Sequence, residues 1–454
     1  MIKFFNRFRF LNLVVLTALY ACQQTDAPIA PVKLLPACGI AVISGYTDKT
    51  SYFPGDEMQV FLDSKSSKDC GLGFYDTKGE LAFGSNVSLF PQTIPAGESW
   101  SNGFKYTTNG KFTIPSNVKG GIYFIEKQIP VVIKSHVPNE VTVVYPVNTL
   151  NAYNCSGGKS LYGFNSTSGL ASPIVSFLRP FNDDSEKDRC IECLKWFPSL
   201  PNVSFSYISD QDMETYSTFE GSKILIIAGH SEYWTRKSRR NFDKFITKGS
   251  HSIILSGNTM WWQVRYSNSR DEMICYKSST NDPEPDPLMK TDLWADTKLD
   301  YSILASIGAD FNHGGYGMRS DNGWDGFKIA NPASPLLEGL NLKRGDIVRM
   351  PSGECDGAPI KSFDNDGFPV LENVMNFEKL ELIGFDKGTR GGAETYPTFI
   401  ALRHTPTSGI IVNTGAMDWC SSSGIGSSGS GSQIKQITTN AITKLLDGKT
   451  VFSN

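Results

Sequence analysis

The chain lacks the features that mark nucleic-acid-binding proteins, integral membrane proteins and conventional zinc enzymes. It carries 43 Lys and Arg against 46 Asp and Glu, a net charge of −3, and no long basic run that would follow a phosphate backbone. Beyond the N-terminus, no segment approaches the ~20 apolar residues that a membrane-spanning helix needs. Only five histidines are present, and they form no HExxH motif. These absences exclude DNA or RNA as an expected partner and argue against a zinc hydrolase.

The N-terminal segment has the pattern of an exported lipoprotein. Its first residues, MIKFFNRFRFLNLVVLTALYAC, place three basic side chains ahead of a short apolar run that ends in Leu-Tyr-Ala-Cys. This pattern resembles the lipobox of bacterial lipoproteins, in which the cysteine is lipidated and begins the mature chain. We therefore expect a signal peptide over residues 1–21, lipidation at Cys22, and a tether over 22–37. The expected location is the bacterial cell envelope, and Gln23 after the cysteine favours the outer membrane.

The remaining length predicts two domains. Residues 38–138 consist of short β-prone runs separated by turn signals, which is typical of an all-β immunoglobulin-like sandwich. From 139 to 454, strand and helix patterns alternate, which predicts an α/β domain with a parallel or mixed sheet and flanking helices, glutamine-amidotransferase-like in its layers. The segment 267–330 is poor in regular pattern, and we expect it to cover a site.

The cysteines in the sequence do not show which disulfides form. Eight cysteines follow Cys22, and export to an oxidising compartment permits disulfides whose pairing the sequence does not give. Cys190 and Cys193 form a single CxxC, which we interpret as a structural disulfide or a pair of buried thiols rather than a metal or redox motif.

Two neighbouring strand patterns end at polar and aromatic residues. Apolar runs at 224–227 and 253–255 are typical of strands covered on both faces, and the pattern between them predicts a helix. Ligands in open α/β sheets lie beyond the carboxyl ends of the strands. The residues expected there are His230, Ser231, Glu232 and Tyr233 after the first strand, and Asn258, Trp261 and Trp262 after the second.

Several chemistries fit these residue types. Ser231 as a nucleophile would need the G-x-S-x-G elbow, but Tyr233 stands where the second glycine belongs. His230 is either a proton shuttle or a structural histidine. Asp418 follows a strand pattern and is a candidate general base. The two tryptophans either form an apolar pocket wall or belong to the core.

Four separated motifs carry a resemblance to a known family. They are AGHSEYW at 228–234, SGNTMWWQVRY at 256–266, MICYK at 273–277 and SGECDG at 352–357. In this order they resemble the large (beta) subunit of N,N-dimethylformamidase and its relatives, over roughly residues 140–420. The chain is much shorter than that subunit and shows no sign of its small partner subunit.

The resemblance implies a mononuclear ferric centre held by two tyrosinates and one glutamate. Carried over to this chain, the ligands are Tyr233, Tyr276 and Glu354. Ferric iron prefers anionic oxygen donors, and open coordination positions would admit water and an amide carbonyl. If both ligands bind one ion, Cys275 and Cys355 lie near each other, and a disulfide between them is a hypothesis.

The N-terminal pattern predicts a lipid anchor, and the resemblance implies an iron-dependent amidohydrolase. Its expected substrate is a small non-peptide amide, with dimethylformamide itself disfavoured by the departures from the family pattern. His230 and Asp418 are the expected catalytic residues, and Asn258, Trp261 and Trp262 the expected pocket. The alternative is a non-catalytic surface protein that binds a glycan or peptide on the same fold. A homo-oligomer or an unidentified subunit remains open.

Overall fold

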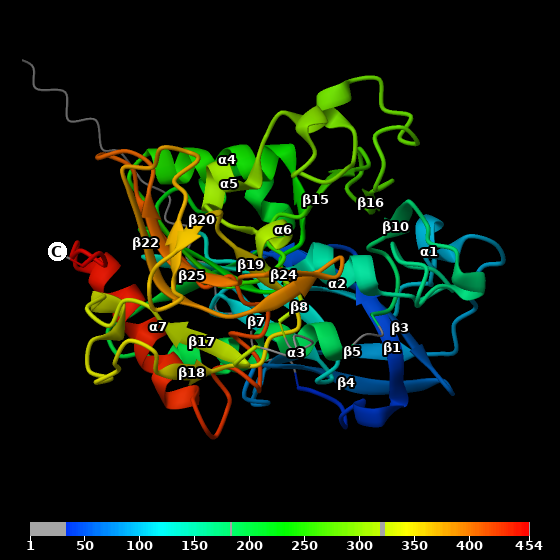
Figure 1. Ribbon diagram of the computed structural model, residues 1–454. Coiled ribbons are helices and arrows are strands. Elements are labelled where there is room, and N and C mark those ends of the chain that lie inside the picture. Colours follow the sequence, from blue (N-terminus) through cyan, green and yellow to red (C-terminus); the bar gives the residue numbers. More distant parts are fainter. Residues whose placement is uncertain (1–32, 182–183, 318–322, 454) are drawn as a thin grey trace, which may run out of the picture. The chain divides into compact units, whose positions relative to one another are not determined.

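The computed structural model of the protein describes residues 33–181, 184–317 and 323–453, and of residues 184 and 185 only the backbone (Figure 1). The signal peptide expected over 1–21 and the lipidation site at Cys22 lie outside these ranges. Contacts group residues 34–454 into one unit. Within the described ranges, no helix has the length and apolar character needed to cross a membrane.

A nine-stranded mixed sheet forms the framework of the fold. Five neighbouring strands are parallel, and the remaining four extend the sheet in antiparallel order. The sequence prediction of an α/β architecture is confirmed at this level. In spatial order the strands are β11 (Phe205–Ser209), β9 (Val141–Tyr145), β12 (Ile224–Gly229), β14 (His251–Ser256), β26 (Ile410–Asn413), β25 (Thr398–Arg403), β22 (Lys379–Phe385), β17 (Gly326–Ile329) and β18 (Ile347–Arg349).

The central strands are apolar throughout because both faces of the sheet are covered. Every residue of β12 is buried. Ile224 and Ile226 pack into the core on the side of α3 (Asp184–Trp196) and α7 (Gly431–Leu446), whereas Leu225 and Ile227 pack on the side of α4 (Arg236–Thr247). This alternation follows from the two-residue repeat of a strand. Because both faces are covered, the strand appears in the sequence as a continuous apolar run.

Helix α4 forms where the sequence predicts it. The hydroxyl of Thr235 accepts a hydrogen bond from the backbone N–H of Ser238 and caps the first turn. Phe242, Phe245 and Ile246 are fully buried and lie on one face at i, i+3 and i+4. The helix therefore connects β12 to β14 and fixes the spacing of the two strand ends.

The N-terminal strands form two sheets around a core of their own. The disulfide between Cys38 and Cys70 closes this region, and Lys134 Nζ lies 2.8 Å from Asp212 Oδ1, which joins it to the residues after β11. A domain boundary at 138 stays a prediction. The strands are β1 (Val42–Thr47), β3 (Glu57–Ser64) and β6 (Gly110–Thr113) in one sheet, and β2 (Ser51–Tyr52), β8 (Ile129–Ile133), β7 (Gly121–Ile125), β4 (Lys68–Tyr75) and β5 (Leu81–Leu89) in the other.

A smaller four-stranded sheet lies next to the ends of the central strands. Its order is β10 (Ile174–Ser176), β16 (Glu272–Ile274), β15 (Trp262–Tyr266) and β13 (Tyr233–Thr235). The segment 267–330 is more regular than its sequence indicates, because it supplies β16 and β17 as well as short helices. Further short elements are α1 (Ser99–Asn102), α2 (Val147–Tyr153), α5 (Ile303–Ile307), α6 (Phe311–Gly314), β19 (Cys355–Gly357), β20 (Ile360–Phe363), β21 (Pro369–Leu371), β23 (Gly388–Arg390) and β24 (Ala393–Thr395).

Five further described cysteines are buried free thiols: Cys190, Cys193, Cys275, Cys355 and Cys420. Cys190 and Cys193 are buried in the core beneath β12, so of the two interpretations of the CxxC the buried thiols hold. Cys275 and Cys355 are also free, and the hypothesis of a disulfide between them is wrong. Cys275 Sγ instead lies 3.8 Å from the carbonyl oxygen of Gln263, on the neighbouring strand β15.

We predict that the Cys38–Cys70 disulfide contributes strongly to the stability of the N-terminal strands. It closes a separation of 32 residues, and alanine at both positions should lower the free energy of unfolding by about 3 kcal/mol. Urea unfolding followed by circular dichroism measures the change. A thiol reductant should lower the unfolding midpoint of the wild type but leave that of the double variant unchanged. An identical response of both proteins to reductant would contradict the prediction.

Candidate functional site

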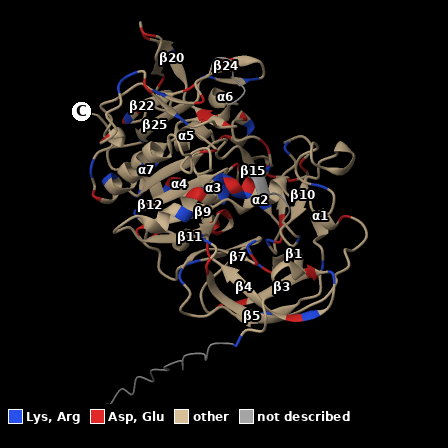
Figure 2. Ribbon diagram, turned by 90° about the horizontal axis from the view of Figure 1, so that it is seen from below, with Lys and Arg blue, Asp and Glu red and all other residues tan. Residues whose placement is uncertain are grey.

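The polar residues that follow β12 and β14 meet in one buried cluster. His230 and Glu232 come from the end of β12, Asn258 from the end of β14, and Glu354 from the segment before β19. Figure 2 shows acidic and basic positions close together near the labels of α3 and α2. Glycine is required at 257, where a Cβ would lie 2.4 Å from the carbonyl oxygen of Glu354. The close approach of these two segments of the chain brings Asn258 and Glu354 together.

Three tyrosines converge on Glu232. Tyr233 Oη donates to Tyr162 Oη at 2.6 Å, and Tyr162 Oη donates to Glu232 Oε1 at 2.8 Å. Tyr153 Oη donates to Glu232 Oε2 at 3.1 Å. Burial raises the pKa of each of these phenols well above its usual value, and burial also raises the pKa of Glu232. The phenols are therefore protonated donors in the absence of a bound cation.

His230 is placed among three glutamates. Its Nδ1 lies 2.9 Å from Glu186 Oε2 on α3, while its Nε2 lies 3.3 Å from Glu354 Oε2 and 3.5 Å from Glu232 Oε2. Burial alone would lower the pKa of the imidazole, but the charge of Glu186 and hydrogen bonds to Glu186 and Glu354 outweigh burial and raise the pKa well above 6.5. An imidazolium at this position offsets the cost of burying the carboxylates.

Glu354 is the carboxylate that reaches toward solvent. Its side chain is 17% exposed, against 2% for His230 and Glu232. Asn258 Nδ2 donates to Glu354 Oε2 at 2.8 Å, with the Asn258 backbone at φ +51°, in the left-handed region. Burial would raise the pKa of Glu354, but the hydrogen bond and charge of His230 lower it below the usual value. Glu354 is thus an ionised group at the edge of the cluster.

Lys277 enters the cluster, and sequence reasoning missed it. Its Nζ lies 3.2 Å from the ring centroid of Tyr162, 4.9 Å from Trp262 and 5.5 Å from Tyr233. Burial lowers its pKa. A lysine next to a candidate tyrosine ligand was the only available signal, and a surface position is the ordinary expectation for such a lysine.

Tyr276 is placed differently from the other predicted ligands. Its backbone N–H donates to Thr291 Oγ1 at 2.8 Å. In the described part of the chain, no hydrogen bond joins its hydroxyl to Tyr233, Glu232 or Glu354. The structure therefore brings Tyr233 and Glu354 into one cluster, while the role of Tyr276 as the third ligand stays a prediction.

The other predicted site residues divide between the cluster and its surroundings. Trp262 contacts Lys277, but Trp261 is 4% exposed and packs in the core with Phe311. Ser231 Oγ accepts a hydrogen bond from Trp234 Nε1.

Asp418 pairs with Arg189 through one oxygen and accepts the backbone N–H of Gly353 through the other, at 2.8 Å. Asp418 thus fixes the segment that carries Glu354, and its role as a general base stays a prediction.

A separate cavity lies on the far side of helix α2. Its volume is about 520 Å³. Leu150 and Asn151 of α2 line it, together with residues of the N-terminal strands such as Tyr46 and Ile129. None of the cluster residues lines this cavity, although Tyr153 on the same helix reaches the cluster.

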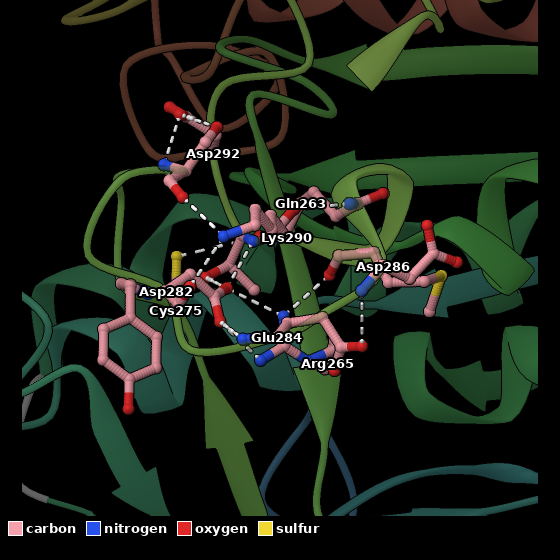
Figure 3. Close-up of polar contacts among 12 residues, drawn as sticks. Gln263, Arg265, Cys275, Asp282, Glu284, Asp286, Lys290 and Asp292 are labelled. Carbon is pink, nitrogen blue, oxygen red and sulfur yellow. Dashed lines mark hydrogen bonds and ion pairs between the residues drawn. The ribbon is translucent and has the colours of Figure 1, made fainter. Parts of the chain in front are cut away.

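The loop that carries Lys277 is held by a buried ion pair (Figure 3). Asp282 accepts hydrogen bonds from both terminal nitrogens of Arg265, at 2.8 and 2.9 Å, and from the backbone and hydroxyl of Thr291, each at 2.6 Å. Gln263 Nε2 donates to the carbonyl of Lys290 at 2.6 Å. These bonds fix the loop against β15, which positions the adjacent Lys277.

We predict that Asp282→Asn destabilises this loop in a pH-dependent manner. Hydrogen bonds from Arg265 and Thr291 outweigh burial and hold the pKa of Asp282 well below its usual value. The stabilisation is therefore present above the unfolded pKa of about 3.9 and is lost as the pH falls toward the folded pKa. The variant should lose about 3 kcal/mol at pH 7, and its difference from wild type should narrow below about pH 4.

Urea unfolding between pH 3 and pH 7 measures this difference. Glu284→Gln is the matched control, because Glu284 also faces Arg265 but lies 3.6 Å away and is 26% exposed. It should cost less than about 1 kcal/mol at any pH. Equal losses in both variants would contradict the proposed anchoring by Asp282.

Of three comparisons with known proteins, one identifies the family of the chain. No curated protein matches the chain. A solved structure of a ThuA-like protein from Bacteroides uniformis is 10% identical, with a TM-score of 0.34, and the match covers 70% of this chain and 96% of that one. The family model described as "N,N-dimethylformamidase beta subunit-like, C-terminal" matches residues 70–427. The chain therefore belongs to the family of N,N-dimethylformamidase beta subunit-like C-terminal domains.

Proposed function

We propose that the protein hydrolyses the C–N bond of a small amide at the cluster around His230. The observation that carries this proposal is the position of an imidazole within 3.5 Å of two carboxylates, at the C-terminal end of a parallel sheet. Family membership supports a relation to amidases. Hydrolysis needs a base for the attacking water and an acid for the departing amine, and the cluster offers both.

The directions of the pKa shifts of Glu354 and His230 assign one task to each residue. Without a bound metal, Glu354, ionised and partly exposed, takes a proton from water while the water oxygen bonds to the carbonyl carbon. His230, which Glu186 keeps protonated, gives its proton to the nitrogen as the C–N bond breaks. The products are a carboxylic acid and an amine. Asn258 and Glu232 orient Glu354 and His230 through the contacts described above.

The donor atoms of the cluster also fit a hard metal ion. Among the described residues, no group of three His, Cys, Asp or Glu side chains is arranged to hold a metal. Tyr233 and Glu354 would hold the ion, with oxygens of Tyr162 and Glu232 beside them. A ferric ion, when bound, supplies a Lewis acid that polarises the amide carbonyl and lowers the pKa of water.

The cavity beside α2 favours a second candidate function. Its aromatic and carboxamide lining, with Tyr46 and Asn151, suits a glycan or peptide, as expected of a non-catalytic surface binding protein. In either case we propose the lipid anchor at Cys22 and the outer membrane location. We also propose that the chain associates with a partner, which is either a second copy of itself or another subunit.

We predict that Glu354→Gln lowers kcat for amide hydrolysis by about 10²- to 10⁴-fold, because it removes the base while keeping the shape of the side chain. Release of amine or ammonia from a panel of small amides measures the rate. Glu372→Gln, at an exposed position, is the control and should retain wild-type activity. Equal activity of both variants would contradict the proposed role of Glu354, and an inactive wild type would favour the binding function.

We predict that the purified protein binds iron and shows a visible phenolate-to-iron absorption band. Metal analysis and absorption spectra of wild type and Tyr233→Phe test this, and the band should weaken in the variant. Tyr276→Phe and Tyr162→Phe then identify the second phenolate, because only the variant that lacks it should weaken the band further. A colourless protein after reconstitution with iron would refute the iron centre but not the acid and base pair.

A further inference from the structure

The cavity beside α2 is lined by two buried carboxamides, each with one unpaired end. Asn151 on α2 and Gln211 after β11 are 6% and 8% exposed. In the described structure, Asn151 Nδ2 and Gln211 Nε2 are buried N–H donors without a hydrogen-bond partner. Buried polar groups in proteins are nearly always hydrogen-bonded. Two unpaired donors in the lining of one cavity therefore indicate a ligand that offers acceptor oxygens.

The orientation of Asn151 is fixed by Arg179. The Nη2 and Nε atoms of Arg179 lie 3.1 and 3.3 Å from the side-chain oxygen of Asn151. Because a guanidinium has only donors, the Asn151 group that faces it must be Oδ1, and Nδ2 is the unpaired end. At Gln211, the hydroxyl of Thr50 donates to Oε1 at 2.8 Å and leaves Nε2 unpaired.

Arg179 is a buried positive charge that also lines the cavity. It stands in the run Phe-Leu-Arg-Pro-Phe at 177–181 and is 2% exposed. Burial lowers its pKa to about 9, so the guanidinium is still charged at pH 7. Its N–H groups donate only to neutral oxygens, which are the carbonyls of Ser156, Lys159, Ser176 and Asn151 and the Oδ1 of Asn151. A buried charge without a counter-ion is costly, and an anion in the cavity would offset that cost.

The acidic residues of the lining do not compensate Arg179. Asp212 pairs with Lys134 at 2.8 Å, and Asp48 accepts hydrogen bonds from residues of the N-terminal strands. Burial and the Cys155 thiol, rather than these carboxylates, shift the pKa of Arg179. The aspartates that line the cavity are Asp48, Asp212 and Asp271.

The remaining lining and the size of the cavity indicate the body of the ligand. Leu150, Phe177 and Ile129 supply apolar surface, and Tyr46 supplies an aromatic ring. A volume of about 520 Å³ is in the range of small-molecule sites. The hydrogen bonds from Arg179 also polarise the Asn151 amide, which strengthens Nδ2 as a donor to an anion.

We propose that this cavity binds a small organic carboxylate with an apolar body. The carboxylate accepts a hydrogen bond from Asn151 Nδ2 and offsets the charge of Arg179, while Gln211 Nε2 offers a second donor to the ligand. The proposal rests on the binding function proposed for this cavity and names its ligand class. It does not depend on amide hydrolysis at the cluster, whose residues do not line the cavity.

Phenylacetate and phenylacetamide test the proposal, because they share one apolar body and differ in charge. Isothermal titration calorimetry with the purified protein at pH 7 measures the Kd of each. We expect the Kd of phenylacetate to be at least ~10-fold below that of phenylacetamide, since only the anion forms a charge-assisted hydrogen bond. Equal affinities would overturn the proposal while leaving a binding site for neutral ligands. Phenylacetate that does not bind at millimolar concentration would also overturn it.

Asn151→Asp assigns binding to this cavity rather than to the cationic groups of the cluster. The variant keeps an oxygen that accepts from Arg179, but it removes the Nδ2 donor and adds a carboxylate beside the guanidinium. It should therefore raise the Kd of phenylacetate at least ~10-fold. Asn341→Asp, the same change at an exposed position outside the cavity, should leave the Kd unchanged. Wild-type affinity in Asn151→Asp would overturn the proposed site.

Discussion

The structure of the site depends on one electrostatic constraint, the burial of negative charge. Glu186, Glu232 and Glu354 surround His230, and burying carboxylates without compensation is costly. The imidazolium of His230 compensates them from the end of β12, because its two ring nitrogens face opposite directions. One nitrogen faces Glu186 on α3, and the other faces Glu232 and Glu354. The strand, the helix and the loop that carry these groups are therefore held in one arrangement.

Polar contacts made by residues of the helices position the segments that carry these side chains. Asn148 on α2 donates its Nδ2 to the carbonyl of Tyr233 at 3.0 Å, and its backbone N–H donates to Asp210. The same helix carries Tyr153 to Glu232. Arg189 on α3 pairs with Asp418, which binds the backbone before Glu354. Functional groups far apart in the chain are thus positioned by a few buried polar contacts rather than by the apolar core alone.

The loop after β16 determines which of its side chains reaches the cluster. The resemblance assigns Tyr276 as a ligand, but the structure brings Lys277 onto the ring of Tyr162, with its backbone at φ +53°. Asp282 and its partners fix the loop in this form. Because a backbone in the left-handed region departs from the alternation of side chains along an extended strand, the conformation at Lys277 affects whether the phenol or the amine enters the cluster. Sequence spacing alone does not resolve that choice.

The sequence by itself determined the elements that depend on local and periodic signals. The buried runs of β12 and β14 follow from apolar repeats, and the start of helix α4 follows from a threonine cap, while the family motifs were identified by resemblance. Tertiary structure alone decided that Tyr153, Tyr162, Glu186 and Lys277 join the cluster, because the local sequence of these distant segments does not show which side chains meet at the strand ends. It also decided that Cys275 and Cys355 stay free thiols. Contacts between distant segments arise from packing and from compensation of buried charge, which no local pattern encodes.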